Sequence, residues 1–380
     1  ALTRVVLCTL MLADLFNRIP DVEAHYTDFG VLPRSEYITN FAQKWMVSLY
    51  MWGGTPLAVY TLMAIQACFV FGLLIGWRTR LMHFLSWIFL ISLHGRNPYV
   101  LQAGDVLLRQ VMFWTMFLPM GAKWSVDAAN NALRDSDPPP KHFASVVSFG
   151  LILQIFIVYF YTWLLKTGVE WRDGTAVWFA LNLDHFSTPV ARFLIEHRWM
   201  TVFLTHFTFY FELLGPFLAF MPFWTQGFRI IAVVGMLGMH IGFGLGLKIG
   251  LFVFVSCASW LPFIPAMVWD RLEAWLDKRR AQNAIVAYDA ECGFCRRGAR
   301  FITHMLLLRR TSVVTGQSDP KLDAAMRAAD SWVYVDHAGA THVGGDAAIA
   351  MVRASPLFWW SAPVLGFGPF RSLIHRWYAF

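Results

Sequence analysis

The sequence predicts a polytopic α-helical membrane domain of about eight spans at residues 1–280, followed by a small α/β domain at residues 281–380. Hydrophobic residues make up 57% of the 380 residues and charged residues only 14%, whereas a soluble domain averages about 45–50% apolar and about 25% charged residues. The mean hydropathy is +0.49, and aromatic residues reach 17%. This composition excludes a wholly soluble protein, a disordered chain and a coiled coil.

Apolar runs that approach the length of a membrane crossing recur along the first 280 residues. A spanning helix needs about 20 mainly apolar residues, and several runs are shorter, so we expect some spans to be tilted, kinked or half-inserted. The two long connections, 17–54 and 166–199, are rich in Trp, Asp, Glu and His and are expected to fold as structured caps. The candidate spans are residues 1–16, 55–76, 81–94, 106–121, 143–165, 200–222, 228–247 and 249–268.

The distribution of charge predicts the orientation and the partners of the chain. Basic residues cluster at 271–280, after the last apolar run, and Lys/Arg near span ends favour the cytoplasmic side of a membrane. We therefore expect an integral membrane protein of a bacterial inner membrane, surrounded by lipid bilayer, with its C-terminal domain in the cytoplasm. The net charge is +7 without a long Lys/Arg run, so nucleic acid is not an expected partner.

A pair of cysteines marks the start of the C-terminal domain. Residues 283–289 are apolar and β-prone and predict a strand, residues 296–310 have helical spacing, and Cys292 and Cys295 lie between them. Backbone N–H groups and the dipole at a helix N-terminus stabilise a thiolate, and the second cysteine lies one turn on, where it can resolve a mixed disulfide. The pattern favours redox chemistry. A zinc site and a purely structural pair remain open, although the further ligands that zinc needs are not at zinc-finger spacing.

The rest of this domain alternates short β-prone runs with helical patterns. Strands are predicted at 313–314, 332–335 and 341–343, and helices at 322–329 and 346–354. Together with the first strand they predict a small α/β sheet of thioredoxin-like size.

The segment around the cysteine pair carries a resemblance to a known family. The sequence YDAECGFC at 288–295 resembles the signature of the DCC family of thioredoxin-like proteins, which is named for an Asp-x-x-Cys-x-x-Cys core. The stretches GDAA at 345–348 and 368–378 also resemble the tail of that family. The resemblance covers about residues 283–380. It implies a thioredoxin-like fold and a thiol-disulfide oxidoreductase in which the two cysteines react.

Ionisable groups inside or beside membrane spans must be paired or hydrated, so each is a functional candidate. The first group, His94 to Asn97 followed by Asp105, joins two apolar runs. Pro98 ends the preceding helix, and Asp105 is expected to cap the next helix while pairing with Arg109 four residues on. A turn satisfied by its own caps and a site that orients a substrate through Asn97 and Asp105 are both open.

The second group follows the apolar run 143–165 and includes Tyr161 and Lys166. One interpretation of Lys166 is an interfacial lysine whose ammonium group reaches back to water. The other is an amine desolvated by its apolar neighbours, with a lowered pKa that lets it act as a base.

The third group lies in the later apolar runs. His206 and Tyr210 share a helix face, and Glu212 stands within a strongly apolar stretch, so it must be protonated, paired or hydrated. His240 belongs to the next run. None of these residues has metal-ligand spacing, so no metal site is predicted.

A second resemblance covers about residues 1–270. The stretch 94–127 resembles the HTTM domain, the membrane domain shared with vitamin K-dependent γ-carboxylases, and QIFIVYFYTWLLKTGVEWRDG at 154–174 is similar to the carboxylase segment that carries the catalytic lysine. The resemblance implies that Lys166 is a base that deprotonates a reduced naphthoquinone, and it places His240 near a histidine of a later carboxylase helix. The large lumenal domain of the carboxylase has no counterpart here, so the resemblance implies the quinol-and-oxygen half of the chemistry.

These observations lead to two interpretations of function. The first is a membrane-bound oxidoreductase acting on a quinol or similar redox lipid, with Lys166 as base and a thiol pair that supplies or receives electrons. The second is a non-catalytic accessory or scaffold subunit of a larger respiratory or photosynthetic membrane complex. A transporter is disfavoured because no inverted repeat is visible. The residues expected to orient the substrate are Asn97, Asp105, Tyr161 and His240.

Overall fold

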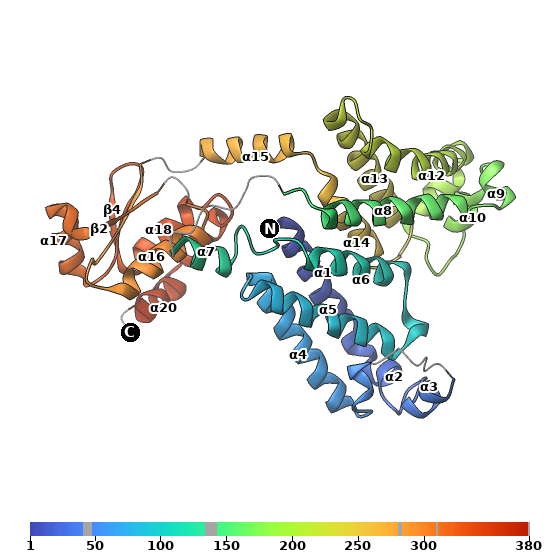
Figure 1. Cartoon of the computed structure of the whole chain (residues 1–380), viewed down its shortest axis with the longest axis horizontal. Coiled ribbons are helices and arrows are strands. Elements are labelled where there is room, and N and C mark those ends of the chain that lie inside the picture. The colour runs from blue at the N-terminus through green and yellow to red at the C-terminus, as the bar shows by residue number, and fades with distance from the viewer. Residues whose placement is uncertain (41–47, 134–142, 280–282, 309–310, 379–380) are drawn as a thin grey trace. The chain divides into compact units, whose positions relative to one another are not determined.

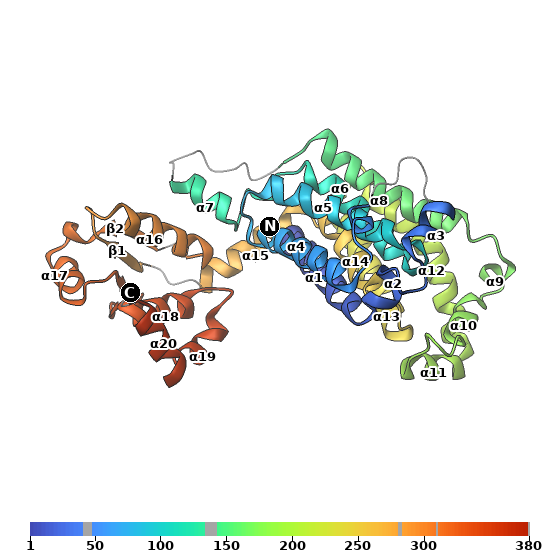
Figure 2. The same ribbon diagram turned by 90° about the horizontal axis from the view of Figure 1, so that it is seen from below.

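The computed structural model describes residues 1–40, 48–133, 143–279, 283–308 and 311–378 (Figures 1 and 2). The chain forms two compact units. The first comprises residues 1–120 and 141–268, and the second comprises residues 121–140 and 269–380. The domain boundary predicted at residue 280 lies outside the described residues.

The N-terminal half of the first unit is built on α1 (Leu2–Arg18), α4 (Pro56–Ile75), α5 (Thr79–Arg96) and α6 (Ala103–Met116). Helix α4 begins after Thr55, whose side chain accepts a hydrogen bond from the Ala58 N–H, and ends at Gly76, which has a φ of 73°. The predicted cap at 17–54 does fold into short elements over its described part. They are η1 (Ile19–Asp21), α2 (Val22–Tyr26), α3 (Arg34–Asn40) and η2 (Leu49–Met51).

The second half of this unit is built on α8 (Val146–Leu164), α12 (Arg198–Ala219), α13 (Thr225–Gly246) and α14 (Phe252–Ser259). Ser145 and Ser148 form a capping box at the start of α8. The predicted cap at 166–199 is structured and contains α9 (Val169–Arg172), α10 (Ala176–Leu181) and α11 (Pro189–Glu196). One hydrophobic core joins α1, α4, α5, α6 and α8 to α12, α13 and α14.

Several apolar helices fit an integral membrane protein, but the count of about eight spans is not confirmed. Among the described residues, α4, α8, α12 and α13 are long and apolar enough to cross a membrane. A fifth span results if Phe252–Phe263 and Ala266–Leu276, which meet at 93°, are counted as one broken span. The other predicted spans form helices that are short or polar: α6 has 14 residues, and α1 has 17 and buries Arg4 and Asp14.

The second unit contains a four-stranded mixed sheet in the order β2-β1-β3-β4. β1 (Ile285–Tyr288) is parallel to β2 (Ser312–Thr315) and antiparallel to β3 (Val333–Val335), which is antiparallel to β4 (Thr341–Val343). All four strands lie where the sequence predicts strands. In register, Ile285 is opposite Ser312 on one side and Val335 on the other.

Helices cover both faces of this sheet, and successive side chains of β1 point alternately to one face and the other. Val286 and Tyr288 join a core with α16 (Gly293–Met305) and α18 (Gly344–Ala354), while Ala287 joins a core with α17 (Pro320–Ala329). The predicted helices at 322–329 and 346–354 are thus present, and the one predicted at 296–310 is present as α16, which ends at Met305. The unit also contains α7 (Val126–Leu133), α19 (Ala362–Leu365) and α20 (Gly368–Tyr378), and α15 (Ala266–Arg279) leads into it from the first unit.

Candidate functional site

Lys166 lies just beyond the C-terminal end of α8 and is paired with an acidic residue of another helix. Its Nζ donates to the backbone oxygen of Thr162 at 3.2 Å and to the carboxylate of Glu212, which projects from α12. The side chain of Lys166 is 14% exposed and that of Glu212 is 6% exposed. Glu212 is therefore paired, which is one of the three states expected for it. The lysine does not extend its ammonium group into water, because the group is turned onto this carboxylate.

A row of aromatic rings begins beside this ion pair. The Nζ of Lys166 lies 5.0 Å from the centroid of the Trp171 ring, a cation–π distance. Trp171 is stacked on Phe209 at 6.3 Å, and Trp163 lies 5.9 Å from the same phenylalanine. The Nε1 of Trp163 is buried and has no hydrogen-bond partner among the described residues. The ammonium group thus lies against one indole ring, which packs on Phe209, and Phe209 in turn contacts the indole of Trp163.

A second polar contact connects α8 to α13. The hydroxyl of Tyr159 lies 2.6 Å from Nε2 of His240, and both side chains are buried. The ring of Tyr159 also lies 5.5 Å from that of Trp260. The Nδ1 of His240 is buried and without a hydrogen-bond partner in the described part of the chain. His240 therefore has one ring nitrogen available.

Tyr159 lies in the C-terminal part of α8, and Lys166 follows two residues after the helix ends at Leu164. Two of the predicted site residues, Lys166 and His240, thus have partners that involve α8: Lys166 follows the helix, and His240 contacts it through Tyr159. Glu212 and Tyr159 are the partners that the structure supplies, and sequence reasoning named neither as catalytic or substrate-binding.

The other predicted orienting residues lie elsewhere. Tyr161 is 54% exposed on α8. Asn97 is fully buried in the turn after α5, where its Nδ2 donates to the His25 oxygen at 2.9 Å and its Oδ1 accepts from the Tyr99 N–H at 3.0 Å. Both ends of the Asn97 amide are therefore engaged with backbone. The structure does not bring these two residues to Lys166 through any contact among the described residues.

Asp105 caps α6 as predicted, but its ion pair is different from the one predicted. Its Oδ2 accepts from the Gln102 N–H at 2.9 Å and completes a capping box. Its Oδ1 accepts from Arg18 of α1 at 2.9 Å, and among the described residues no ion pair with Arg109 is formed. The expectation from i, i+4 spacing was wrong because a long-range partner occupies the carboxylate.

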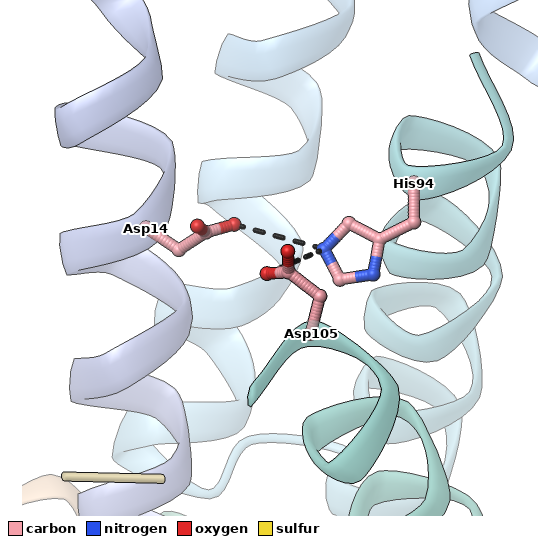
Figure 3. Close-up of side chains that lie close together, drawn as sticks. All are labelled: Asp14, His94 and Asp105. Atoms are coloured by element: carbon pink, nitrogen blue, oxygen red, sulfur yellow. Dashed lines mark ion pairs between the residues drawn. The ribbon is translucent and has the colours of Figure 1, made fainter. Parts of the chain in front are cut away.

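Around Asp105, the structure gathers polar groups from three helices. Arg18 bridges Asp105 and Asp14, with its Nε 2.9 Å from Asp14 Oδ2. The Nε2 of His94, from α5, lies 3.8 Å from the same Asp14 oxygen and 3.6 Å from Asp105 Oδ1 (Figure 3). Sequence reasoning grouped His94 with Asp105 but not with Asp14 and Arg18, because the two pairs are about 80 residues apart along the chain and only helix packing brings them together.

In the second unit, Cys292 and Cys295 form a disulfide with a Cα–Cα distance of 5.2 Å. Cys292 is the N-cap of α16, and its Sγ accepts from the Cys295 N–H at 3.1 Å. The preceding loop is fixed by Asp289, whose Oδ1 accepts from the Gln317 amide at 2.7 Å. Phe294, between the cysteines, is 81% exposed. The pair is thus at the helix N-terminus predicted for it, and next to an apolar surface residue.

A pocket also lies among the connecting helices of the first unit. It is lined by Gly174, Thr175, Trp178, Phe179, Arg198, Thr201 and Val202. None of the residues predicted from the sequence as catalytic or substrate-binding contributes to its lining.

Two family models match the chain. The DCC1-like thiol-disulfide oxidoreductase model matches residues 286–380, and the HTTM domain model matches residues 1–269. No curated protein and no solved structure matches the chain. Both resemblances inferred from the sequence are confirmed, and the two domains support a membrane protein related to redox chemistry. The chain belongs to the HTTM domain family and carries a DCC1-like thiol-disulfide oxidoreductase domain at its C-terminal end.

Proposed function

We propose that this protein is a membrane-bound oxidoreductase that takes a quinol from the bilayer and deprotonates it at Lys166. The observation that carries the proposal is the ion pair of Lys166 with Glu212, with the Trp171 ring beside the ammonium group and Phe209 and Trp163 packed next to that ring in turn. A quinol is flat and apolar with two phenolic hydroxyls, so it matches aromatic walls around a group that accepts protons. The indole N–H of Trp163 is available to a quinol oxygen.

The pair can move a proton without leaving an isolated charge. Lys166 carries the proton in the ion pair, and its transfer to the Glu212 carboxylate frees the lone pair of Nζ. The amine then accepts a phenolic proton from the quinol. The result is one ammonium group, one neutral carboxylic acid and one quinolate anion, so the net charge of the site does not change. Each charge remains next to a partner, as burial requires.

Molecular oxygen is the proposed oxidant of the quinolate. Transfer of two electrons and two protons from the quinol to oxygen gives the quinone and hydrogen peroxide. Addition of oxygen to the ring gives instead the quinone epoxide and water, with one oxygen atom in each product. In both reactions the base at Lys166 forms the electron-rich quinolate anion, and oxygen reacts with this anion.

The thiol pair provides a second redox centre in this proposal. Opening the Cys292–Cys295 disulfide consumes two electrons and two protons and gives a dithiol. A donor or acceptor thiol approaches at the N-terminus of α16, where backbone N–H groups stabilise a Cys292 thiolate. The proposal assigns no direction to this exchange.

Oxygen-dependent oxidation of reduced naphthoquinone and of ubiquinol by the purified chain tests the proposal, with products identified by mass spectrometry. Lys166→Arg is the informative variant, because arginine keeps the ion pair with Glu212 but does not deprotonate. Lys248→Met is the matched control, since Lys248 follows the end of α13 and is exposed. Turnover by wild type and Lys248→Met, with loss of at least tenfold in Lys166→Arg, supports the base. Turnover unaffected by Lys166→Arg excludes it, and no turnover by wild type favours the accessory-subunit interpretation.

A further inference from the structure

The cluster around His94 has the geometry of a cation site. Nε2 of His94, Oδ2 of Asp14 and Oδ1 of Asp105 all lie within 4.8 Å of one another. They come from α5, α1 and α6, and Figure 3 shows the imidazole directed at both carboxylates. His94 is 0% exposed, Asp105 5% and Asp14 8%. Water has little access to these three groups, so they must be satisfied by one another or by a bound species.

His94 is the group that remains unsatisfied. Neither of its ring nitrogens has a hydrogen-bond partner among the described residues. Its Nε2 is 3.6 and 3.8 Å from the two carboxylate oxygens, beyond hydrogen-bonding distance. A buried imidazole nitrogen that faces two carboxylates without bonding either one leaves room for an atom that all three contact.

The charges of the cluster also favour a further cation. Two carboxylates and the Arg18 guanidinium sum to one negative charge when His94 is neutral. Arg18 is held in place by Asp14, Asp105 and the hydroxyl of Tyr26, to which its Nη1 donates at 2.6 Å. Each carboxylate oxygen has a second lone pair, so Arg18 can orient the two acids while a cation bridges them to His94. Carboxylates that bind metals are commonly hydrogen-bonded in this way by a neighbouring side chain.

We propose that Asp14, His94 and Asp105 bind one first-row divalent metal ion of the Mn²⁺, Fe²⁺ or Zn²⁺ class. One imidazole nitrogen with two carboxylate oxygens is a mixed donor set that suits these ions, whereas Ca²⁺ takes six to eight oxygen ligands. The protein supplies three donors and leaves the remaining positions to water or to a further ligand. The site is independent of the function proposed for Lys166.

The full-length chain in detergent is stripped with a chelator, incubated with MnCl₂ or ZnCl₂, desalted and analysed for metal content. Wild type is expected to retain about one ion per chain. His94→Gln and Asp14→Asn are expected to lower the affinity at least tenfold, as loss of a metal ligand does. The matched control is His83→Gln, since His83 is a buried histidine of the same helix whose Nε2 instead faces the Met112 oxygen at 3.0 Å. The control is expected to retain the ion.

A second measurement uses wild type alone, so its result does not depend on whether the variants fold. Electron spin-echo spectroscopy of the Mn²⁺-loaded chain is expected to show nitrogen coupling from one imidazole. The proposal is overturned if wild type retains no ion, if the bound Mn²⁺ shows no nitrogen coupling, or if folded His94→Gln retains the ion as well as wild type. In the first of these cases the cluster is an ion-pair network in which a proton on His94 supplies the missing charge.

Discussion

The ammonium group of Lys166 and the carboxylate of Glu212 form an ion pair that joins the end of α8 to the middle of α12. Neither side chain is more than 14% exposed, so each charge depends on the other. The same contact fixes the lysine against aromatic rings and supplies a second group that can hold its proton. The same contact therefore contributes both to the packing of α8 against α12 and to the proposed chemistry.

Glu212→Gln is expected to destabilise the folded chain because it leaves the Lys166 charge buried without a partner. Breaking a buried pair by removal of one charge costs about 3–5 kcal/mol. The double variant Lys166→Met with Glu212→Gln is expected to be less destabilised than the sum of the two single variants. Unfolding of the four proteins in detergent gives the coupling free energy. Strict additivity would show that the two side chains do not interact.

Removal of the Tyr159 hydroxyl is expected to destabilise the contact between α8 and α13. In Tyr159→Phe, His240 loses the hydrogen bond at Nε2 while its Nδ1 already lacks one. A buried polar group left unsatisfied costs about 1–3 kcal/mol. Tyr161→Phe is the control, because Tyr161 is exposed on the same helix, and its melting temperature is expected to match wild type. Equal melting temperatures for both variants would show that the Tyr159–His240 contact contributes nothing.

The sequence predicted the local structure of the chain well and its long-range contacts poorly. The cysteine pair, the four strands and the cap on α6 depend on residues close together in sequence, and each is where the pattern placed it. The ion-pair partner predicted for Asp105 was wrong: Asp105 binds Arg18, 87 residues away, instead of Arg109. Glu212 was identified as a charge that needs a partner, yet spacing along the chain contains no information on its pairing with Lys166.

The span count shows a second limit of sequence reasoning. Apolar composition identified α4, α8, α12 and α13, which are long and apolar enough to cross a membrane. Composition also led us to count the runs at 1–16 and 81–94 as membrane spans. The helices formed there, α1 and α5, contribute buried Asp14, His94 and Arg96 to polar contacts inside the unit. A hydropathy window cannot distinguish a helix that faces lipid from one that packs polar groups against its neighbours.

After reduction of the disulfide, Cys292 is expected to react with an alkylating reagent faster than Cys295. Cys292 is the N-cap of α16 and its sulfur accepts from a backbone N–H, which stabilises the thiolate. Mass spectrometry of the alkylated chain measures both rates, with buried Cys8 as the internal reference for an unreactive thiol. Equal rates at Cys292 and Cys295 would contradict this account of the pair.

Acid is expected to weaken the β3–β4 hairpin through Asp336. The hydrogen bond from His342, at 2.9 Å, holds the pKa of Asp336 below its usual value of 3.8, and N–H groups of Ala338 and Ala340 lower it further. A depressed carboxyl pKa contributes stability that is present above 3.8 and is lost as the pH falls through the lower, folded-state pKa. Asp336→Asn is therefore expected to exchange amide hydrogens at 333–343 faster than wild type at pH 6, with the difference shrinking as the pH falls below 3.8. A difference that does not depend on pH would assign the effect to the turn hydrogen bonds alone.

The central claim is that Lys166 removes a proton from a bound quinol, and an anaerobic absorbance titration tests it most directly. Without oxygen, and with Cys292 and Cys295 reduced beforehand, the quinolate has no electron acceptor, so reduced naphthoquinone bound to wild type is expected to show the quinolate spectrum at neutral pH. The Lys166→Arg variant, which keeps the pair with Glu212, is expected to bind the same compound with the spectrum of the neutral quinol. Quinolate formed equally by both proteins, or by neither, would contradict the account.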